Sequence, residues 1–172
     1  MGAHAYDVFR QKGDWLLALK LRETTFVRTT SASTRKRLLE LGLSPEKLKF
    51  VRRGLSRWPK SFKYTGFGNP LEILSVGRLV PKKGYFAQLE ILQAMYAARI
   101  AFRARIVGGG PLRVSLERER DRLGLAPCLT LLGPLSENET LRLYEETDLF
   151  VFTGKAASDG DRDGIPSVIP EA

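Results

Sequence analysis

Apolar and polar residues follow a strand–helix rhythm between residues 71 and 152. Short apolar runs at 71–76, 102–107, 129–132 and 149–152 have the length of buried strands and are bounded by glycine or polar turns. Between the first two runs, apolar residues recur every three or four positions, as in a helix packed on a sheet: Phe86, Leu89, Leu92, Met95 and Tyr96. This alternation predicts an α/β fold with a Rossmann-like parallel sheet, right-handed crossovers and helices on both faces.

Two further helices carry start or stop signals. Pro111 suits the first helical position, and Leu112, Leu116 and Leu123 fall on one face before Gly124 ends the segment. Ser136 followed by Glu139 forms the pattern of a capping box for a helix that continues to Tyr144.

The first part of the chain has weaker signals of the same kind. Residues 15–19 and a segment capped by Ser33 predict helices, and residues 25–29 and 48–51 predict strands. Residues 57–70 contain two prolines and two glycines without a clear period, which is typical of a linker. We therefore predict a division into residues 1–56, a linker at 57–70, and a second domain at 71–172.

Charge separates the same two parts. Residues 1–70 hold 15 Lys or Arg and 5 Asp or Glu, a net charge of +10, whereas residues 71–172 hold 13 and 14, a net charge of −1. A basic first part suits anionic lipid, nucleic acid or an acidic substrate, and it also suits a solvated face without a partner. With one cysteine, Cys128, and one histidine, His4, the chain has no internal disulfide and lacks the usual zinc ligands. No apolar run is long enough to span a bilayer, and no signal-peptide pattern is present.

Two loops after predicted strands could bind phosphate. Arg78 and Lys83 follow the strand at 71–76, where open α/β sheets bind ligands, and two cations there could hold a diphosphate and stabilise it as a leaving group. Gly108, Gly109 and Gly110 join the next strand to a helix whose free N–H groups could attract phosphate. For both loops a plainer reading stays open: a solvated basic loop in the first case and a conformational turn in the second.

The last ten residues carry two acids eight positions apart, Asp163 and Glu171, around a Gly-x-Pro turn. This spacing places one acid on a loop and the other about two helical turns on, so both could face a ligand at the helix start. The preceding Asp159-x-Asp161-x-Asp163 imitates a calcium loop, but its twelfth position is Pro170 instead of the bidentate Glu. A divalent-ion site on these acids, or a polar loop that positions Asp163, are the remaining readings.

Together these motifs resemble the retaining GT-B glycosyltransferases of family 4, the group 1 transferases. The family's order and approximate spacing are kept by four motifs: Gly77-Arg78…Lys83-Gly84, Gly108-Gly109-Gly110-Pro111, Leu132-Gly133-Pro134 and Asp163-Gly164-Ile165-Pro166…Glu171-Ala172. His4-Ala5-Tyr6-Asp7 and the stretch from Ser31 to Gly54 resemble the later part of the family's N-terminal domain. The chain departs from the pattern at three points: Asp163 replaces Glu, Arg53 precedes Gly54 where Asn is usual, and Pro170 lies inside the expected closing helix.

The resemblance implies a role for each matching residue. Arg78 and Lys83 would bind the donor diphosphate, with backbone N–H groups of Gly164 and Ile165 as further donors. Gly133 and Pro134 would lie near the base, and Glu171 would bind the ribose hydroxyls. His4 and Asp163 would be catalytic, with His4 facing the reaction centre from the first domain and Asp163 near the transferred sugar.

The resemblance also implies the partners of the protein. The donor would be a nucleotide-diphosphate sugar and the acceptor a glycan or lipid-linked molecule, of the bacterial exopolysaccharide or lipopolysaccharide type. No metal, no cofactor and no nucleic-acid partner are expected. Residues 1–56 would be the C-terminal part of an acceptor-side domain, and residues 71–172 a nucleotide-sugar-binding domain incomplete at its C-terminus. We expect a cytoplasmic protein that rests at the inner face of an anionic membrane.

Because the family's opening strands and closing helices have no counterpart here, we expect the 172 residues alone to show little or no transfer. Two other classes stay open. A sugar-nucleotide-binding remnant without catalysis would have the same fold, and turnover would distinguish it. A nucleic-acid-binding domain would use the basic first 70 residues, although the chain lacks a helix-turn-helix signature; steep salt dependence of binding would favour it.

Overall fold

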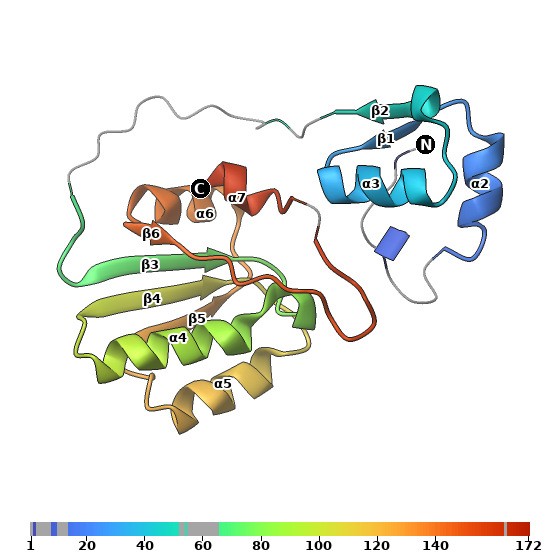
Figure 1. Cartoon of the computed structure of the whole chain (residues 1–172). Helices are drawn as coiled ribbons and strands as arrows, with labels where there is room; N and C mark the ends of the chain where they lie inside the picture. Colours follow the sequence, from blue (N-terminus) through green and yellow to red (C-terminus); the bar gives the residue numbers. More distant parts are fainter. Residues whose placement is uncertain (1, 3–7, 10–13, 52–53, 55–65, 164) are drawn as a thin grey trace. The chain divides into compact units, whose positions relative to one another are not determined.

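The computed structural model describes residues 2, 8–9, 14–51, 54, 66–163 and 165–172. The chain divides into two compact units, each with its own hydrophobic core (Figure 1). Unit 1 comprises Met1–Trp58 and Lys155–Glu171, and unit 2 comprises Pro59–Gly154 with Ala172. Most of the predicted linker lies outside the described residues, so the domain boundaries at 56 and 71 stay a prediction.

Unit 2 is built around a four-stranded parallel sheet with the order β5-β4-β3-β6. Its elements are β3 (Leu71–Val76), η2 (Pro81–Lys83), α4 (Tyr85–Ala97), β4 (Phe102–Val107), α5 (Arg113–Arg122), β5 (Leu129–Gly133), α6 (Glu137–Glu145) and β6 (Leu149–Phe150). The ladder between β3 and β4 runs without interruption from Leu71↔Phe102 to Val76↔Val107. The α/β class and the parallel sheet are therefore as the alternation of the sequence predicts.

Alternate residues of the strands form the core under α4 and α5, which lie on the same side of the sheet (Figure 1). Ile73, Ala104 and Leu131 point to this side and pack with Leu89 of α4 and Leu116 of α5. Each fully buried Leu or Ile contributes about 1.5–3 kcal/mol relative to an exposed side chain. The core thus fixes the loops that leave the C-terminal ends of the strands.

Helix α6 lies on the other face of the sheet. Its N-terminus is the predicted capping box: the Ser136 hydroxyl accepts from the Glu139 N–H at 3.3 Å, and the Glu139 carboxylate accepts from the Ser136 N–H at 2.8 Å. At its C-terminal end, Glu146 bonds Arg105, which alternates with the core residue Ala104 and so projects from the opposite face of the sheet. Helices therefore lie on both faces, as predicted.

Unit 1 contains a two-stranded parallel sheet and short helices. Its elements are α2 (Leu17–Glu23), β1 (Val27–Thr29), α3 (Ala32–Glu40), η1 (Pro45–Lys47), β2 (Leu48–Phe50) and α7 (Val168–Glu171). Its core consists of Val8, Leu17, Leu21, Val27, Leu38 and Leu43. The predicted cap of α3 is off by two positions: Ser31, and not Ser33, is the N-cap, and its hydroxyl accepts from the Thr34 N–H at 3.1 Å.

Other differences concern boundaries and faces. Phe86 and Tyr96 were predicted on the core face of α4 but are 38% and 48% exposed, and Tyr85, next to Phe86, is buried instead. Strand β6 ends at Phe150, two residues earlier than predicted, and the Ser75 hydroxyl donates to the carbonyl of the next residue, Val151, at 2.7 Å. In the part of the chain that the structure describes, no helix is both long and apolar enough to cross a membrane.

Candidate functional site

The four parallel strands of unit 2 direct their C-terminal ends to one edge of the sheet. Strand order runs from β3 through β4 to β5 in one direction, and then reverses, so that β6 lies on the other side of β3. In open α/β sheets ligands bind at such a reversal, in the crevice beyond the strand ends. The loops after β3 and β6 therefore border the position where a ligand is expected.

Arg78 and Lys83 lie on the loop after β3. Between them Leu79 is completely buried, donates its N–H to the Gly109 carbonyl at 2.9 Å and accepts from the Leu112 N–H at 3.1 Å. This anchor holds the middle of the loop against the sheet edge, while the Arg78 side chain is exposed and Lys83 is half-buried at the end of η2.

The Lys83 side chain occupies a defined position on that loop. Its ammonium lies 5.1 Å from the centroid of the Phe152 ring, within the range of a cation–π interaction. Its carbon stem passes Gly77 so closely that a Cβ on Gly77 would lie 3.5 Å from Cε. The Tyr85 hydroxyl donates to the Gly77 carbonyl at 3.0 Å and fixes this turn. The cation is thus held at the strand-order reversal.

The three glycines after β4 make close backbone contacts. A Cβ on Gly108 would collide with the Gly77 carbonyl, and one on Gly110 would lie 2.6 Å from the Leu79 carbonyl oxygen. The first N–H groups of the following helix are also bonded within the chain, from Leu112 to the Leu79 carbonyl and from Arg113 to the Gly110 carbonyl. These contacts are consistent with a conformational role of the loop, and phosphate binding by the helix N–H groups stays a prediction.

Gly133 and Pro134 lie at the same edge. The Gly133 carbonyl accepts from the Gly108 N–H at 2.8 Å, and a Cβ on Gly109 would lie 3.1 Å from Pro134 Cγ. The end of β5 therefore touches the glycine loop, which in turn touches the loop of Arg78. Four residues that the resemblance assigns to the donor (Arg78, Lys83, Gly133 and Pro134) share one edge of unit 2; their roles stay predictions.

The acids belong to unit 1 and are described within it. Asp163 is half-buried, Ile165 is 53% exposed, and Glu171 is exposed at the last residue of α7. Because α7 has only four residues, Glu171 lies one turn into a helix and not two. Pro170 lies in that same first turn, where helix N–H groups have no intrahelical partner, so it costs α7 no hydrogen bond.

The acidic loop before Asp163 is closed on itself. The Ala157 N–H donates to the Asp161 carbonyl at 2.8 Å, and the Asp161 N–H donates to the Asp159 carboxylate at 3.0 Å. Arg162 stacks 3.5 Å from the centroid of the Phe9 ring. Among the described residues, no three His, Cys, Asp or Glu side chains are grouped to hold a metal ion. His4 and Gly164, two further predicted site residues, lie outside the described residues.

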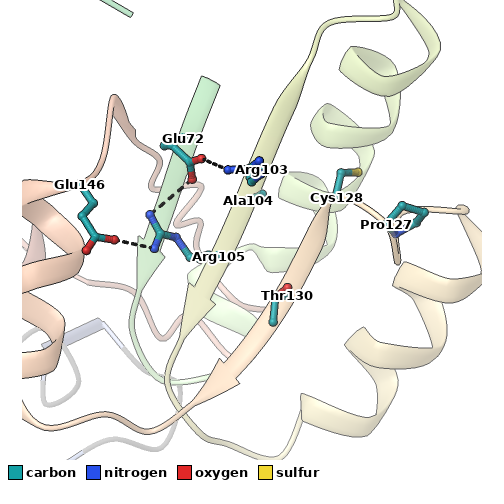
Figure 2. A pocket seen from close by; sticks show the side chains of 8 residues that line it. All are labelled: Glu72, Arg103, Ala104, Arg105, Pro127, Cys128, Thr130 and Glu146. Atoms are coloured by element: carbon teal, nitrogen blue, oxygen red, sulfur yellow. Dashed lines mark hydrogen bonds and ion pairs between the residues drawn. The ribbon is translucent and has the colours of Figure 1, made fainter. Parts of the chain in front are cut away.

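A hollow of about 420 Å³ lies on the face of the sheet opposite α4 and α5 (Figure 2). Glu72 accepts from Arg103 at 3.1 Å and from Arg105 at 3.4 Å, and Arg105 also donates to Glu146 at 3.0 Å. Cys128 lines the hollow, and burial raises the pKa of its thiol above the ordinary value. Its charges are balanced in pairs, and it contains none of the predicted site residues.

Sequence reasoning missed several residues around Lys83, among them Tyr85, Gln88, Phe152 and Thr153. One signal was present: Ser75 and Gln88 are polar residues at core-facing positions of an apolar strand and helix, and both are buried. Polar groups at such positions have to bond each other or the backbone, and here they do. The contact partners of Phe152 and Thr153 have no comparable local signal.

Known proteins resemble this chain in sequence and in fold. The family model for glycosyl transferases group 1 matches residues 56–172. The WcaL protein of Salmonella typhimurium, named for a colanic acid biosynthesis glycosyltransferase, is 33% identical over 139 residues, covering 79% of this chain and 34% of that protein. The amylovoran biosynthesis glycosyltransferase AmsK of Erwinia amylovora is 32% identical with the same coverage. The chain thus spans about a third of the length of the curated relatives it matches.

A solved structure, Anabaena Alr3699/HepE in complex with UDP, superposes with a TM-score of 0.73 and 20% identity, covering 99% of this chain and 50% of that one. This likeness confirms the predicted fold class, Rossmann-like parallel sheets of the GT-B type.

Proposed function

The chain belongs to the group 1 glycosyl transferases, and from this premise we propose that it is the donor-binding part of an enzyme that transfers a sugar from a nucleotide-diphosphate sugar to a glycan or lipid-linked acceptor. The observation that carries the proposal is the position of Arg78 and Lys83 on the loop at the strand-order reversal. Two cations beside the expected ligand position suit a diphosphate, whose negative charge increases as it departs. UDP in the Anabaena structure and the relatives' names support this donor class and a bacterial polysaccharide acceptor.

The proposed reaction retains the configuration of the sugar. The bond from the anomeric carbon to the diphosphate oxygen breaks, and its electron pair stays on the diphosphate. The acceptor hydroxyl oxygen bonds the anomeric carbon on the same face, and its proton passes to the departing diphosphate oxygen. Asp163 and His4 are proposed near the reacting sugar, and Glu171 at the ribose. In any product that forms, the configuration at the anomeric carbon, read by NMR from the coupling of the anomeric proton, tests retention.

Calorimetry with UDP-sugars and GDP-sugars, with and without a chelator, tests the donor site. We expect either the UDP-sugars or the GDP-sugars to bind, with the same affinity in the presence and absence of the chelator, since Arg78 and Lys83 take the place of a metal ion. Arg78→Met and Lys83→Met each remove one charge and should weaken binding about tenfold or more. Arg118→Met removes the same charge from an exposed position of α5 and is the matched control. Unchanged affinity in both site variants would contradict the proposal.

We further propose that unit 1 rests on the cytoplasmic face of an anionic membrane, where a lipid-linked acceptor would lie. Several large apolar side chains of this basic unit are exposed to solvent, among them Trp15 at 88%, Leu19 at 53% and Phe26 at 48%. Tryptophan and basic residues suit the interface between headgroups and acyl chains. Co-sedimentation with vesicles should increase with their anionic lipid content and decrease with salt, and insensitivity to both would contradict this placement.

A further inference from the structure

Two chain segments border the strand-order reversal of unit 2. One is the loop after β3, residues 77–84, which carries Arg78 and Lys83. The other is the segment after β6, residues 151–154, which follows the short ladder from β3 to β6. The Val151 N–H extends this ladder by donating to the Leu74 carbonyl at 2.9 Å. The two segments are therefore neighbours at the ligand edge, although about 70 residues separate them along the chain.

Thr153 joins these segments through its side chain. Its hydroxyl lies 3.0 Å from the Gly84 carbonyl oxygen and 3.3 Å from that of Lys83, so one proton is shared between two acceptors. The backbones approach so closely that a Cβ on Gly84 would collide with the Thr153 carbonyl, and Gly84 has a left-handed φ of 70°. The contact fixes the turn between η2 and α4. Lys83, the last residue of η2, directly precedes this turn.

A buried pair of side chains, Gln88 and Ser75, also holds these two segments together. The Gln88 amide donates to the Ser75 hydroxyl at 2.6 Å, and that hydroxyl donates to the Val151 carbonyl at 2.7 Å. Both side chains are at most 2% exposed. Hydrogen bonds in a region without water hold their geometry tightly, because breaking them leaves a buried polar group unsatisfied. Residues 151–153 are therefore fixed relative to the first turn of α4.

The same short segment also holds the charged end of Lys83. Phe152, next to Thr153, presents its ring to the Lys83 ammonium at 5.1 Å. Thr153 thus bonds the main chain of Lys83 while Phe152 contacts its head group. A lysine side chain has many rotamers, and the cost of ordering it on binding is smaller when its turn is already fixed.

We propose that Thr153 is a positioning residue for donor binding: its hydroxyl holds the turn of Lys83 so that the ammonium meets the diphosphate. This inference rests on the proposed function of Lys83 in diphosphate binding. The competing explanation is a purely structural role, in which Thr153 stabilises unit 2 without any specific effect on the diphosphate. If Thr153 positions Lys83, loss of its hydroxyl weakens the binding of the diphosphate group and leaves the binding of the nucleoside unchanged. If its role is purely structural, loss of the hydroxyl affects nucleotide and nucleoside alike.

The test compares Thr153→Val, which keeps the shape and removes the donor, with Thr153→Ser, which restores the hydroxyl. Calorimetry with the 172-residue chain measures the affinity for UDP and GDP and for the corresponding nucleosides. For the nucleotide that the parent binds, Thr153→Val should weaken binding about three- to tenfold, with the affinity for its nucleoside unchanged. Thr153→Ser should stay within about twofold of the parent. Thr140→Val is the matched control, because Thr140 also donates to a backbone carbonyl, that of Ser136 at 2.9 Å on α6.

A double-mutant cycle with Lys83→Met separates the two explanations. If Thr153 acts through Lys83, Thr153→Val should weaken binding no further in the Lys83→Met background. Additive effects, equal weakening of nucleotide and nucleoside, or parent affinity in Thr153→Val would each overturn the inference while the proposed function stands. If the parent chain binds neither UDP nor GDP, the proposed function is overturned and this inference with it.

Discussion

The α-carbon of Gly108 lies so close to the carbonyl of Gly77 that no side chain can fit between the loops after β3 and β4. Gly108 also has a φ of 136°, which L-residues rarely adopt. Gly108→Ala should therefore destabilise unit 2 by at least about 2 kcal/mol, measured by urea unfolding. Gly109→Ala is the control, since its Cβ would meet side-chain atoms of Pro134 and no backbone, with Cγ at 3.1 Å and Cδ at 3.7 Å. Equal stability of both variants would show that the glycine loop is not packed as described.

Gln88 is a buried polar residue whose loss should be felt in stability. Gln88→Met keeps the length of the side chain but removes the donor to Ser75, and we expect a loss of about 1–2 kcal/mol in the free energy of unfolding. Gln93→Met places the same change on an exposed position of α4 and should alter stability by less than about 0.5 kcal/mol. Two variants of equal stability would argue against the Gln88–Ser75 hydrogen bond.

Arg105 links β4 to Glu72 of β3 and to Glu146, the C-cap of α6, whereas among the described residues Arg103 bonds Glu72 alone (Figure 2). The Arg105 side chain is 21% exposed and that of Arg103 is 69% exposed. Because exposed ion pairs contribute little, Arg103→Met should cost at most about 0.5 kcal/mol, and Arg105→Met should cost about 1–2 kcal/mol. Thermal unfolding of the two variants compares their stabilities, and a larger loss of stability in Arg103→Met than in Arg105→Met would contradict this ranking.

The capping box of α6 predicts a pH dependence. Hydrogen bonds from the Ser136 hydroxyl and N–H lower the pKa of Glu139 below its ordinary value of 4.5. A carboxylate with a lowered folded pKa stabilises the folded state above its unfolded pKa, and this contribution is lost as the pH falls through the folded pKa. An NMR titration of the Glu139 carboxyl should therefore have a higher midpoint in Ser136→Ala than in the parent.

The same substitution gives a stability test. Ser136→Ala should cost about 1 kcal/mol at neutral pH as a lost N-cap. The difference in stability between variant and parent should narrow as the pH falls from 4.5 through the lowered folded pKa of Glu139, because protonation then weakens the box in both proteins. A gap that stays constant across this range would show that the Glu139 carboxylate does not contribute.

Much of the fold could be predicted because its signals are local. The strands β3 and β4 match the apolar runs at 71–76 and 102–107, and the capping box needs only Ser136 and Glu139. The core face of α4 could be predicted in part, because Leu89, Leu92 and Met95 pack in the core as expected. Its edges could not be predicted, because apolar residues such as Ile91 also lie on the exposed side of this helix. As a result Phe86 was placed inside and Tyr85 was overlooked.

The site divides in the same way. Arg78 and Lys83 could be placed at the sheet edge, because the edge follows from the order of strands and glycines along the chain. Thr153 and Phe152 could not, because their contacts exist only once β6 pairs with β3 across more than 70 residues. The resemblance predicted roles for the residues that match the family's motifs. It predicted none for Thr153 and Phe152, which contact Lys83 but belong to no motif.

A crystal structure of the chain with bound UDP or GDP tests the central claim most directly. The account predicts that the diphosphate lies at the loop after β3, with the guanidinium of Arg78 and the ammonium of Lys83 within hydrogen-bonding distance of its oxygens. A nucleotide bound elsewhere on the molecule, or one whose diphosphate contacts neither cation, would contradict the account.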